Sequence, residues 1–174
     1  DANGNEDIAI CTVLVEDNIA PNVICQDVTV QLDVDGNGSI TVDEVDNGTS
    51  DACGIEDLSL SQTDFTCDNV GAVTVTLTAI DILENTSSAD CTITVEDNVS
   101  PVALCQDVTV QLDANGNGAT TAAAVDNGTN DACGIANLAL DITDFTCADV
   151  GDNPVVLTVT DVNGNESTAE CTVT

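Results

Sequence analysis

Two kinds of side chain in this sequence can do chemistry: carboxylates and cysteine thiols. The chain of 174 residues has 32 Asp and Glu and nine Cys, but no Lys, Arg or His. Without His or Lys, a Ser-His-Asp triad, a Cys-His pair, a Schiff-base lysine and a histidine-ligated zinc are all excluded. Carboxylates and amides are the oxygen ligands that Ca²⁺ prefers, at about six to eight per ion. The composition therefore favours Ca²⁺ as the partner of these acids.

Three groups of residues have the types and spacing that a calcium site needs. One is an acidic linker that occurs twice, one fits the twelve-residue EF-hand loop pattern, and one is an Asp-Asn-Gly-x-x-Asp motif near a turn. The candidate ligands are Glu16, Asp17, Asn18, Glu96, Asp97 and Asn98 in the linkers, Asp33, Asp35 and Asn37 in the loop, and Asp51, Asp131, Asp81 and Asp161 in the motif and the turn.

Each of these matches has a competing interpretation. The linkers could be solvated acidic segments that end at a proline. The EF-hand loop has Glu44 at its last position, but Ala124 replaces this residue in a second copy of the loop, and the flanks have strand patterns. A β-hairpin turn rich in Asn and Gly explains the loop as well. The linkers are the stronger candidate, because no side chain can neutralise them.

The composition also excludes several partners and activities. Without Lys or Arg, the chain cannot neutralise nucleic-acid phosphates, and it has nothing to attract an anionic membrane surface. An enzyme built from carboxylates alone would need a cleft and, for sugars, aromatic platforms. The chain has two Phe, no Trp and no Tyr. We therefore expect no catalytic activity, no nucleic-acid partner and no membrane insertion.

The sequence repeats itself with a period of 80 residues. VEDNIAPNVICQDVTVQLDVDGNG begins at Val15 and VEDNVSPVALCQDVTVQLDANGNG begins at Val95, and about 47 of 80 positions are identical. Residues 1–14 match the end of a repeat, with Asp1, Asp81 and Asp161 aligned. We therefore expect the last strand of a preceding repeat at 1–14, and complete repeats at 15–94 and 95–174.

Within a repeat, apolar residues alternate with Thr and other polar residues. The pattern is clear at 28–32, 73–78 and 91–95, and clusters of Asp, Asn and Gly separate these segments. Period-two alternation bounded by turn residues is typical of half-buried strands. The predicted fold class is all-β, with tandem immunoglobulin-like antiparallel β-sandwich repeats. So few aromatic residues make a thin core, which needs covalent stabilisation.

The cysteines provide that stabilisation as disulfides. Each repeat has four, which permits three connectivities, and such an even count is typical of an oxidising compartment. We favour one bond between the first and last strands and one that closes a short loop, worth about 4 and about 3 kcal/mol in the loop-entropy model. An alternative, Cys11–Cys25 with Cys91–Cys105, would cross the linker between repeats. The favoured pairs are Cys25–Cys91, Cys53–Cys67, Cys105–Cys171 and Cys133–Cys147, with Cys11 bonded outside this sequence.

The motifs resemble those of the hyalin-repeat family and of tandem repeats in large bacterial cell-surface proteins. The residues that carry the resemblance are Pro21-x-x-x-Cys25-x-Asp27-Val28, Cys91-x-Ile93-x-Val95-x-Asp97 and the turn Asp161-Val162-Asn163-Gly164-Asn165. The resemblance implies an immunoglobulin-like sandwich, an extracellular location and an adhesive or architectural role, and it supports Cys25–Cys91. The usual aromatic core positions are absent, and Cys53 and Cys67 are additional.

The functional prediction is a structural repeat of an extracellular filament or cell-surface stalk, held by disulfides and calcium. Its partners are neighbouring repeats of the same long chain or other copies in a homo-oligomeric filament. The alternative is an adhesin that binds glycans through calcium. A stalk repeats almost unchanged, whereas an adhesin should carry a divergent repeat with aromatic residues at its tip. The identity between the two repeats favours the stalk.

Overall fold

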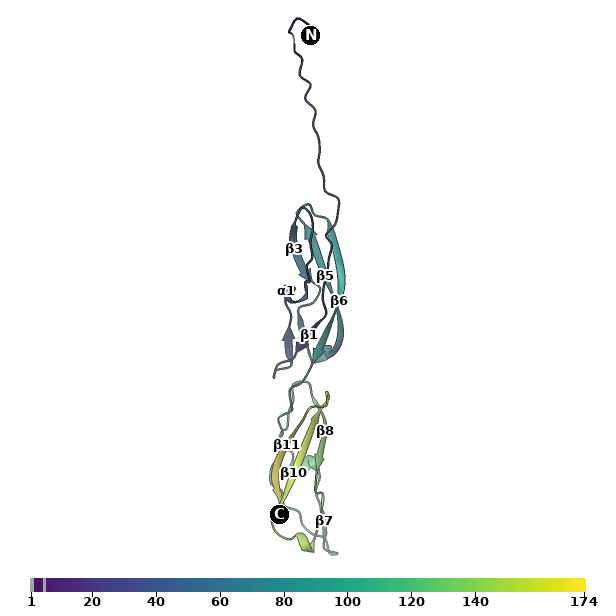
Figure 1. The fold of residues 1–174 in the computed structure, drawn as a ribbon. Helices are drawn as coiled ribbons and strands as arrows, with labels where there is room; N and C mark the ends of the chain where they lie inside the picture. Colours follow the sequence, from purple (N-terminus) through teal and green to yellow (C-terminus); the bar gives the residue numbers. More distant parts are fainter. Residues whose placement is uncertain (1, 5) are drawn as a thin grey trace.

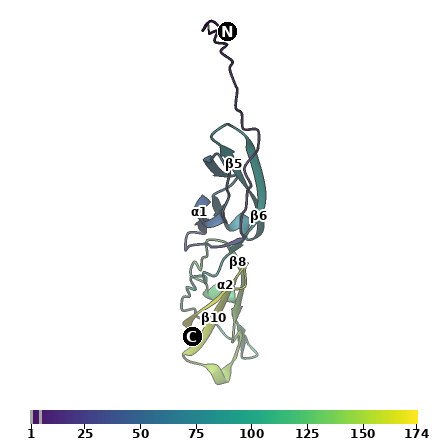
Figure 2. The same cartoon turned by 45° about the horizontal axis from the view of Figure 1, so that its top comes forward.

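The computed structural model describes residues 2–4 and 6–174. Two β-rich bodies lie end to end, and the N-terminal residues extend away from the first body (Figure 1). The same elongated arrangement is visible after rotation by 45° (Figure 2). Asp1 and Asn5, which belong to the predicted segment 1–14, lie outside the described residues. Residues 6–14, predicted as a last strand, form no strand in this structure, and their side chains are exposed.

The two bodies have closely similar elements. The first contains β1 (Val28–Gln31), β2 (Asn37–Ser39), the one-turn helix α1 (Val42–Val45), β3 (Ile55–Leu60), β4 (Asp64–Thr66), the 3₁₀ turn η1 (Cys67–Asn69), β5 (Gly71–Asp81) and β6 (Thr86–Glu96). The second contains β7 (Asn117–Ala119), α2 (Ala122–Val125), β8 (Ile135–Leu140), β9 (Asp144–Thr146), η2 (Cys147–Asp149), β10 (Asn153–Asp161) and β11 (Glu166–Val173).

Each body is an all-β sandwich of a larger and a smaller sheet. In the first body the strand order is β1-β6-β5-β3, and β2 pairs with β4. In the second it is β11-β10-β8, and β7 pairs with β9. The alternation in the sequence fixes which face is buried: Val75 and Leu77 of β5 and Ile93 of β6 are fully buried, and Phe65 of β4 packs against them. The intervening Thr side chains face outward.

One strand pair differs from the predicted antiparallel sandwich. β1 pairs with β6 in parallel, with Val28 opposite Ile93 and Val30 opposite Val95. Parallel strands need a long connection, and here almost the whole repeat lies between them. β6 also continues to Glu96, two residues past the predicted repeat boundary at 94. Val95 is only 1% exposed, so it belongs to the core of the first body.

One disulfide in each sandwich links the beginning of the body to its last strand. Cys25–Cys91 and Cys105–Cys171 link the segment before the first strand position to the last strand of the same body, with Cα–Cα distances of 6.0 and 5.9 Å. These are the pairs favoured from the sequence. Each bond closes a loop that contains nearly the whole repeat, which in the chain-entropy model destabilises the unfolded chain most effectively.

The burial pattern predicts a clear difference between two leucines of the first body. Leu77→Ala removes a fully buried side chain, whereas the control Leu83→Ala removes one that is 52% exposed. Truncation of a buried Leu should lower the free energy of unfolding by about 2–5 kcal/mol. Guanidinium denaturation followed by circular dichroism measures this, since the chain lacks Trp and Tyr. Equal stability of the two variants would contradict the assigned core.

Candidate metal site at the repeat junction

The turn between β10 and β11 is organised by one buried carboxylate. Asp161 is 1% exposed. Its Oδ1 atom accepts the backbone N–H groups of Asn163 and Asn165, both at 2.8 Å, and its Oδ2 atom accepts the Asn165 side-chain amide at 2.8 Å. Gly164 has φ 94°, a left-handed conformation that glycine adopts without strain. Asp161 therefore holds its own turn, although the sequence placed it among the calcium ligands.

These hydrogen bonds keep Asp161 ionised despite its burial. Burial by itself raises the pKa of the carboxyl group, because it disfavours the charged form. The Asn165 side chain and the backbone N–H groups of the turn lower the pKa by more, so that it lies below its usual value of 3.8. Asp81 has the same arrangement in the first body, with a lowered pKa and hydrogen bonds from Leu83 and Asn85.

The same turn forms hydrogen bonds with the linker that leads into the second body. The Asn163 side chain donates a hydrogen bond to Asp97 Oδ2 at 2.6 Å, and the Asn165 side chain donates to the Asp97 carbonyl at 3.0 Å. Asp97 is only 7% exposed. In the first body, Asn85 donates to the Asp17 carbonyl at 3.2 Å, but Leu83 occupies the position of Asn163 and cannot donate. The linker before the second body is thus held by one more side-chain contact.

Two carboxylates and a sulfur meet at the end of each linker. Asp131 Oδ1 accepts the N–H groups of Cys133 and Gly134 at 2.8 and 3.1 Å. Among the described residues, two groups have ligand atoms within 4.8 Å of one another: Asp97, Asp131 and Cys133, and the equivalent Asp17, Asp51 and Cys53. Cys133 is in a disulfide, so its sulfur is not a thiolate donor. The carboxylates of Asp97 and Asp131 are therefore the core of the candidate site.

A disulfide crosses the junction beside this site. Cys67 of η1 bonds to Cys133 of the second body, with a Cα–Cα distance of 5.1 Å. The predicted pairs Cys53–Cys67 and Cys133–Cys147 are therefore wrong, and Cys53 and Cys147 are free and exposed, as is Cys11. The physical reason is that Cys53 and Cys67 lie at opposite ends of the first body, because the six residues of β3, which span about 20 Å, run between them.

The contacts around this disulfide, which we call the latch, are tight. A Cβ atom at Gly36 would lie 2.7 Å from the Cys67 sulfur and 3.1 Å from the Ala132 side chain. The loop between β1 and β2 therefore reaches the segment 131–134 of the second body. Gly36 has φ 75°, so a larger residue would be disfavoured there by both backbone and space. The two bodies meet through small residues around one covalent bond.

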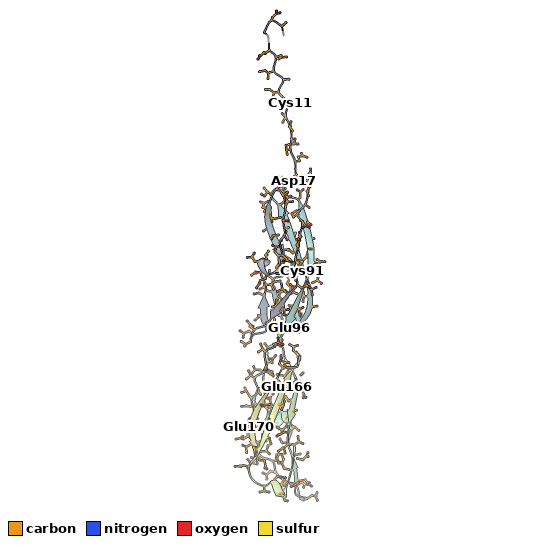
Figure 3. All side chains as sticks on the ribbon, in the orientation of Figure 1. Cys11, Asp17, Cys91, Glu96, Glu166 and Glu170 are labelled. Atoms are coloured by element: carbon orange, nitrogen blue, oxygen red, sulfur yellow. A yellow bond between two sulfur atoms is a disulfide. The ribbon has the colours of Figure 1, made fainter. Side chains whose placement is uncertain are left out.

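The other predicted calcium ligands do not converge on Asp97. Glu96 accepts a hydrogen bond from Gln31, and Asn98 donates to Gln31, so both lie against the first body. Asp33 Oδ1 accepts the N–H groups of residues 35 and 37, which makes the EF-hand match a hairpin turn. Glu44, its last position, instead caps α1 by accepting the Thr41 N–H and hydroxyl groups. Glu16 and Asn18 are exposed at the far end of the first body, where Asp17 also lies (Figure 3).

Sequence reasoning missed Asn163 and Gln31 as junction residues. A signal for Asn163 was present, since it belongs to the turn motif Asp161–Asn165 that carries part of the resemblance to hyalin repeats. Gln31 gave no signal, because it has the outward position of an ordinary strand. Its role arises only where β1 ends beside Glu96 in the parallel pair.

Comparison with known proteins gives distant structural likenesses. No family model and no curated protein matches the sequence. The chain is similar to the protocadherin GammaB4 extracellular domain (15% identity, TM-score 0.40, 90% of this chain and 32% of that chain) and to mouse clustered PcdhgC3 EC1-3 (14%, 0.38, 88% and 66%). It is also similar to the human desmocollin-1 ectodomain (10%, 0.33, 91% and 38%). The chain spans less than two thirds of each of these structures.

The lowered pKa of Asp161 predicts a specific pH dependence. A carboxylate with a lowered pKa stabilises the fold above its unfolded pKa, and this stabilisation is lost as the pH falls through the folded pKa. Asp161→Asn should therefore lower the melting temperature at pH 7, and the difference from the parent chain should shrink as the pH falls below about 4. Calorimetry from pH 7 to pH 2 in chelator measures it. A difference that is constant with pH would contradict the assigned hydrogen bonds.

Proposed function

We propose that the chain is a structural unit of an extracellular rod, whose repeats are fixed end to end by a disulfide and by calcium at an acidic joint. The observation that carries this proposal is the latch, Cys67–Cys133, which joins the two bodies beside Asp97 and Asp131. A bond at this place restrains the angle between the bodies, which a disulfide inside one body cannot do. A rigid joint is of use to a protein that spans distance or bears load.

The three disulfides support an extracellular location. Disulfides persist in oxidising compartments and are rare where thiols are kept reduced. Cys25, Cys67 and Cys105 each bond to a cysteine 66 residues further along the chain. In the described part of the chain, no helix is long and apolar enough to cross a bilayer.

The donor set at the joint fits a hard divalent cation. Asp97 and Asp131 bring two carboxylates together, and the chain has no side-chain cation to neutralise them. The Asn163 side chain now donates its amide N–H to Asp97, but rotation of this amide would present its oxygen, which is a calcium ligand. Asp97, Asp131 and Asn163 are thus the side chains that would hold Ca²⁺, and the ion would supply the missing positive charge.

The burial of the site favours a structural role over the adhesin alternative. Asp97 is 7% exposed and is flanked by the latch and by the turn at Asn163. An ion held there would be surrounded by the joint and would have little surface for a glycan. It would instead link the linker to the second body. In this proposal, calcium therefore stabilises the joint between successive bodies of the rod.

The calcium proposal predicts uptake that depends on the two junction carboxylates. Titration calorimetry of the chelator-stripped protein should detect binding in the range of extracellular modules, about 10⁻⁴–10⁻³ M. At a hundredfold excess over Kd, the native state should gain about 2.7 kcal/mol, with a higher melting temperature. The double variant Asp97→Asn, Asp131→Asn should lose the strongest site. Asp57→Asn removes an exposed carboxylate from β3 and should bind as the parent does.

A further variant distinguishes a calcium site at the joint from one in the hairpin loop between β1 and β2. Asp35→Asn removes an exposed carboxylate of the former EF-hand candidate and should leave calcium uptake unchanged. If Asp35→Asn abolished binding while the junction double variant bound normally, the site would be the hairpin. If the parent chain took up no calcium and melted at the same temperature in chelator and in calcium, the proposal would be wrong.

A further inference from the structure

We propose that the latch, Cys67–Cys133, is a redox switch: a small thiol opens it before either disulfide inside a body, and the joint between two folded bodies then becomes flexible. This inference names the regulation of the proposed rod and rests on that function for its biological meaning. Its evidence is the contrast between the surroundings of the latch and those of the other two disulfides in the described residues.

Chain length does not distinguish the three disulfides. Cys25–Cys91, Cys67–Cys133 and Cys105–Cys171 each join residues that are 66 apart in the sequence. In the chain-entropy model, the effect of a disulfide on the unfolded chain depends on the length of the loop that it closes, so this contribution is the same for all three. Any difference in their resistance to reduction therefore comes from the folded structure around each bond.

The core shields one cysteine of each disulfide inside a body. Cys91 is 4% exposed and Cys171 is 7% exposed, and each belongs to the buried core of its body. Both cysteines of the latch, in contrast, are only half-buried. Reduction requires that a thiolate reach one of the sulfur atoms, and exposed disulfides are the more easily reduced ones. Access by solvent therefore favours attack at the latch.

Hydrogen bonds inside each body also keep its two cysteines together. The residue after the second cysteine donates its N–H to the aspartate two positions after the first cysteine. In the first body, Thr92 N–H donates to Asp27 Oδ1 at 2.8 Å, and in the second, Thr172 N–H donates to Asp107 Oδ1 at 2.7 Å. After reduction, the two thiols of a body would stay near each other at a high effective concentration, which favours the bonded state.

The two sides of the latch lack such hydrogen bonds. Within the part of the chain that the structure describes, none joins residues 64–70 to residues 130–136. The hydrogen bonds that hold the second body at the joint are made by the linker, at Asp97. An opened latch would therefore leave its thiols connected through the linker and the small contacts at Gly36, with a lower effective concentration than inside a body.

The opening reaction consumes two molecules of a small thiol such as glutathione. The first thiolate attacks one latch sulfur, forms a mixed disulfide and releases the other cysteine as a thiolate. The second thiolate attacks the small-molecule sulfur of the mixed disulfide and releases the remaining cysteine. The two cysteines gain two electrons and two protons in total, and the two small thiols are oxidised to one disulfide. The reverse exchange closes the latch again.

Opening the latch leaves both bodies intact. Each keeps its own apolar core and the disulfide that links its beginning to its last strand. The bond that restrains the angle between the bodies is the one that is lost. A small thiol would thus change the stiffness of the rod without unfolding its repeats.

The order of reduction is tested in the full chain with Cys11, Cys53 and Cys147 replaced by Ser, because these exposed thiols would exchange with the disulfides. The protein is equilibrated in chelator with mixtures of reduced and oxidised glutathione, and free thiols are alkylated. Digestion with an acid-specific protease and mass spectrometry then measure each bond. The latch should open at an equilibrium constant at least about tenfold more favourable to reduction, because a hydrogen bond to a charged group contributes about this factor or more.

Two matched variants test the cause of this order. Asp27→Ala removes the acceptor beside Cys25–Cys91, so that bond should become about tenfold easier to reduce while Cys105–Cys171 is unchanged. Asp107→Ala should have the opposite selectivity. The latch should be unaffected in both variants, so each variant is a control for the other. Circular dichroism confirms that both are folded.

X-ray scattering tests whether the open latch frees the joint. Protein that is reduced at the latch alone should have a broader distribution of interatomic distances than the oxidised protein. Its scattering profile should match that of the double variant Cys67→Ser, Cys133→Ser, and its circular dichroism should be unchanged. Reoxidation should restore the original profile.

Several results would overturn the inference. Reduction of a disulfide inside a body before the latch, or together with it, would show that the latch is not the labile bond. An unchanged scattering profile after the latch opens would show that it does not control the joint. Equal effects of Asp27→Ala and Asp107→Ala on all three bonds would contradict the assigned cause. Because the order is measured in chelator, failure of calcium uptake would leave it unaffected, and a wrong order would leave calcium uptake unaffected.

Discussion

The structure depends on one constraint: no side chain in this sequence can carry a positive charge. Each of the 32 carboxylates must therefore be satisfied by an N–H or O–H donor, by water or by a cation from outside. Several are satisfied locally, as Asp33, Asp81 and Asp161 each accept backbone N–H groups of their own turn. These acidic residues thus stabilise turns, in addition to giving the chain its negative charge. Because ion pairs between side chains cannot join the repeats, covalent bonds have to stabilise the bodies and the junction between them.

The disulfides have two structural roles. Cys25–Cys91 and Cys105–Cys171 stabilise a thin apolar core within each body, and Cys67–Cys133 fixes one body to the next. The contacts near the latch are made by Gly36, Ala132 and the Asp97–Asn163 hydrogen bond. Interfaces between domains commonly permit relative motion unless they are large and hydrophobic. The covalent bond converts the contact between the two bodies into a defined joint.

The sequence predicted the strands better than the connections between them. Alternation of Val and Thr located β5 and β6, because a half-buried strand imposes period two on its residues. The parallel β1–β6 pair was not predicted, since alternation carries no information on direction. Cys53–Cys67 was favoured because the two cysteines are close in sequence and their bond would close a short loop. In the structure, β3 runs between them and separates them in space. The EF-hand pattern at Asp33 lies in a hairpin turn, and Glu44, its last position, caps α1 instead of closing the loop. Within the candidate site, Asp97 and Asp131 were among the predicted ligands, but Asn163 was not.

The central claim is that the latch fixes the angle between the two bodies, and residual dipolar couplings of backbone amides test it most directly. In the oxidised protein, one alignment tensor should fit the couplings of residues 28–96 and of residues 105–173. In the double variant Cys67→Ser, Cys133→Ser in chelator, each body should keep its own internal structure but require a separate tensor of different magnitude. Two different tensors in the oxidised parent chain would contradict the account, since the bodies would then move independently despite the bond.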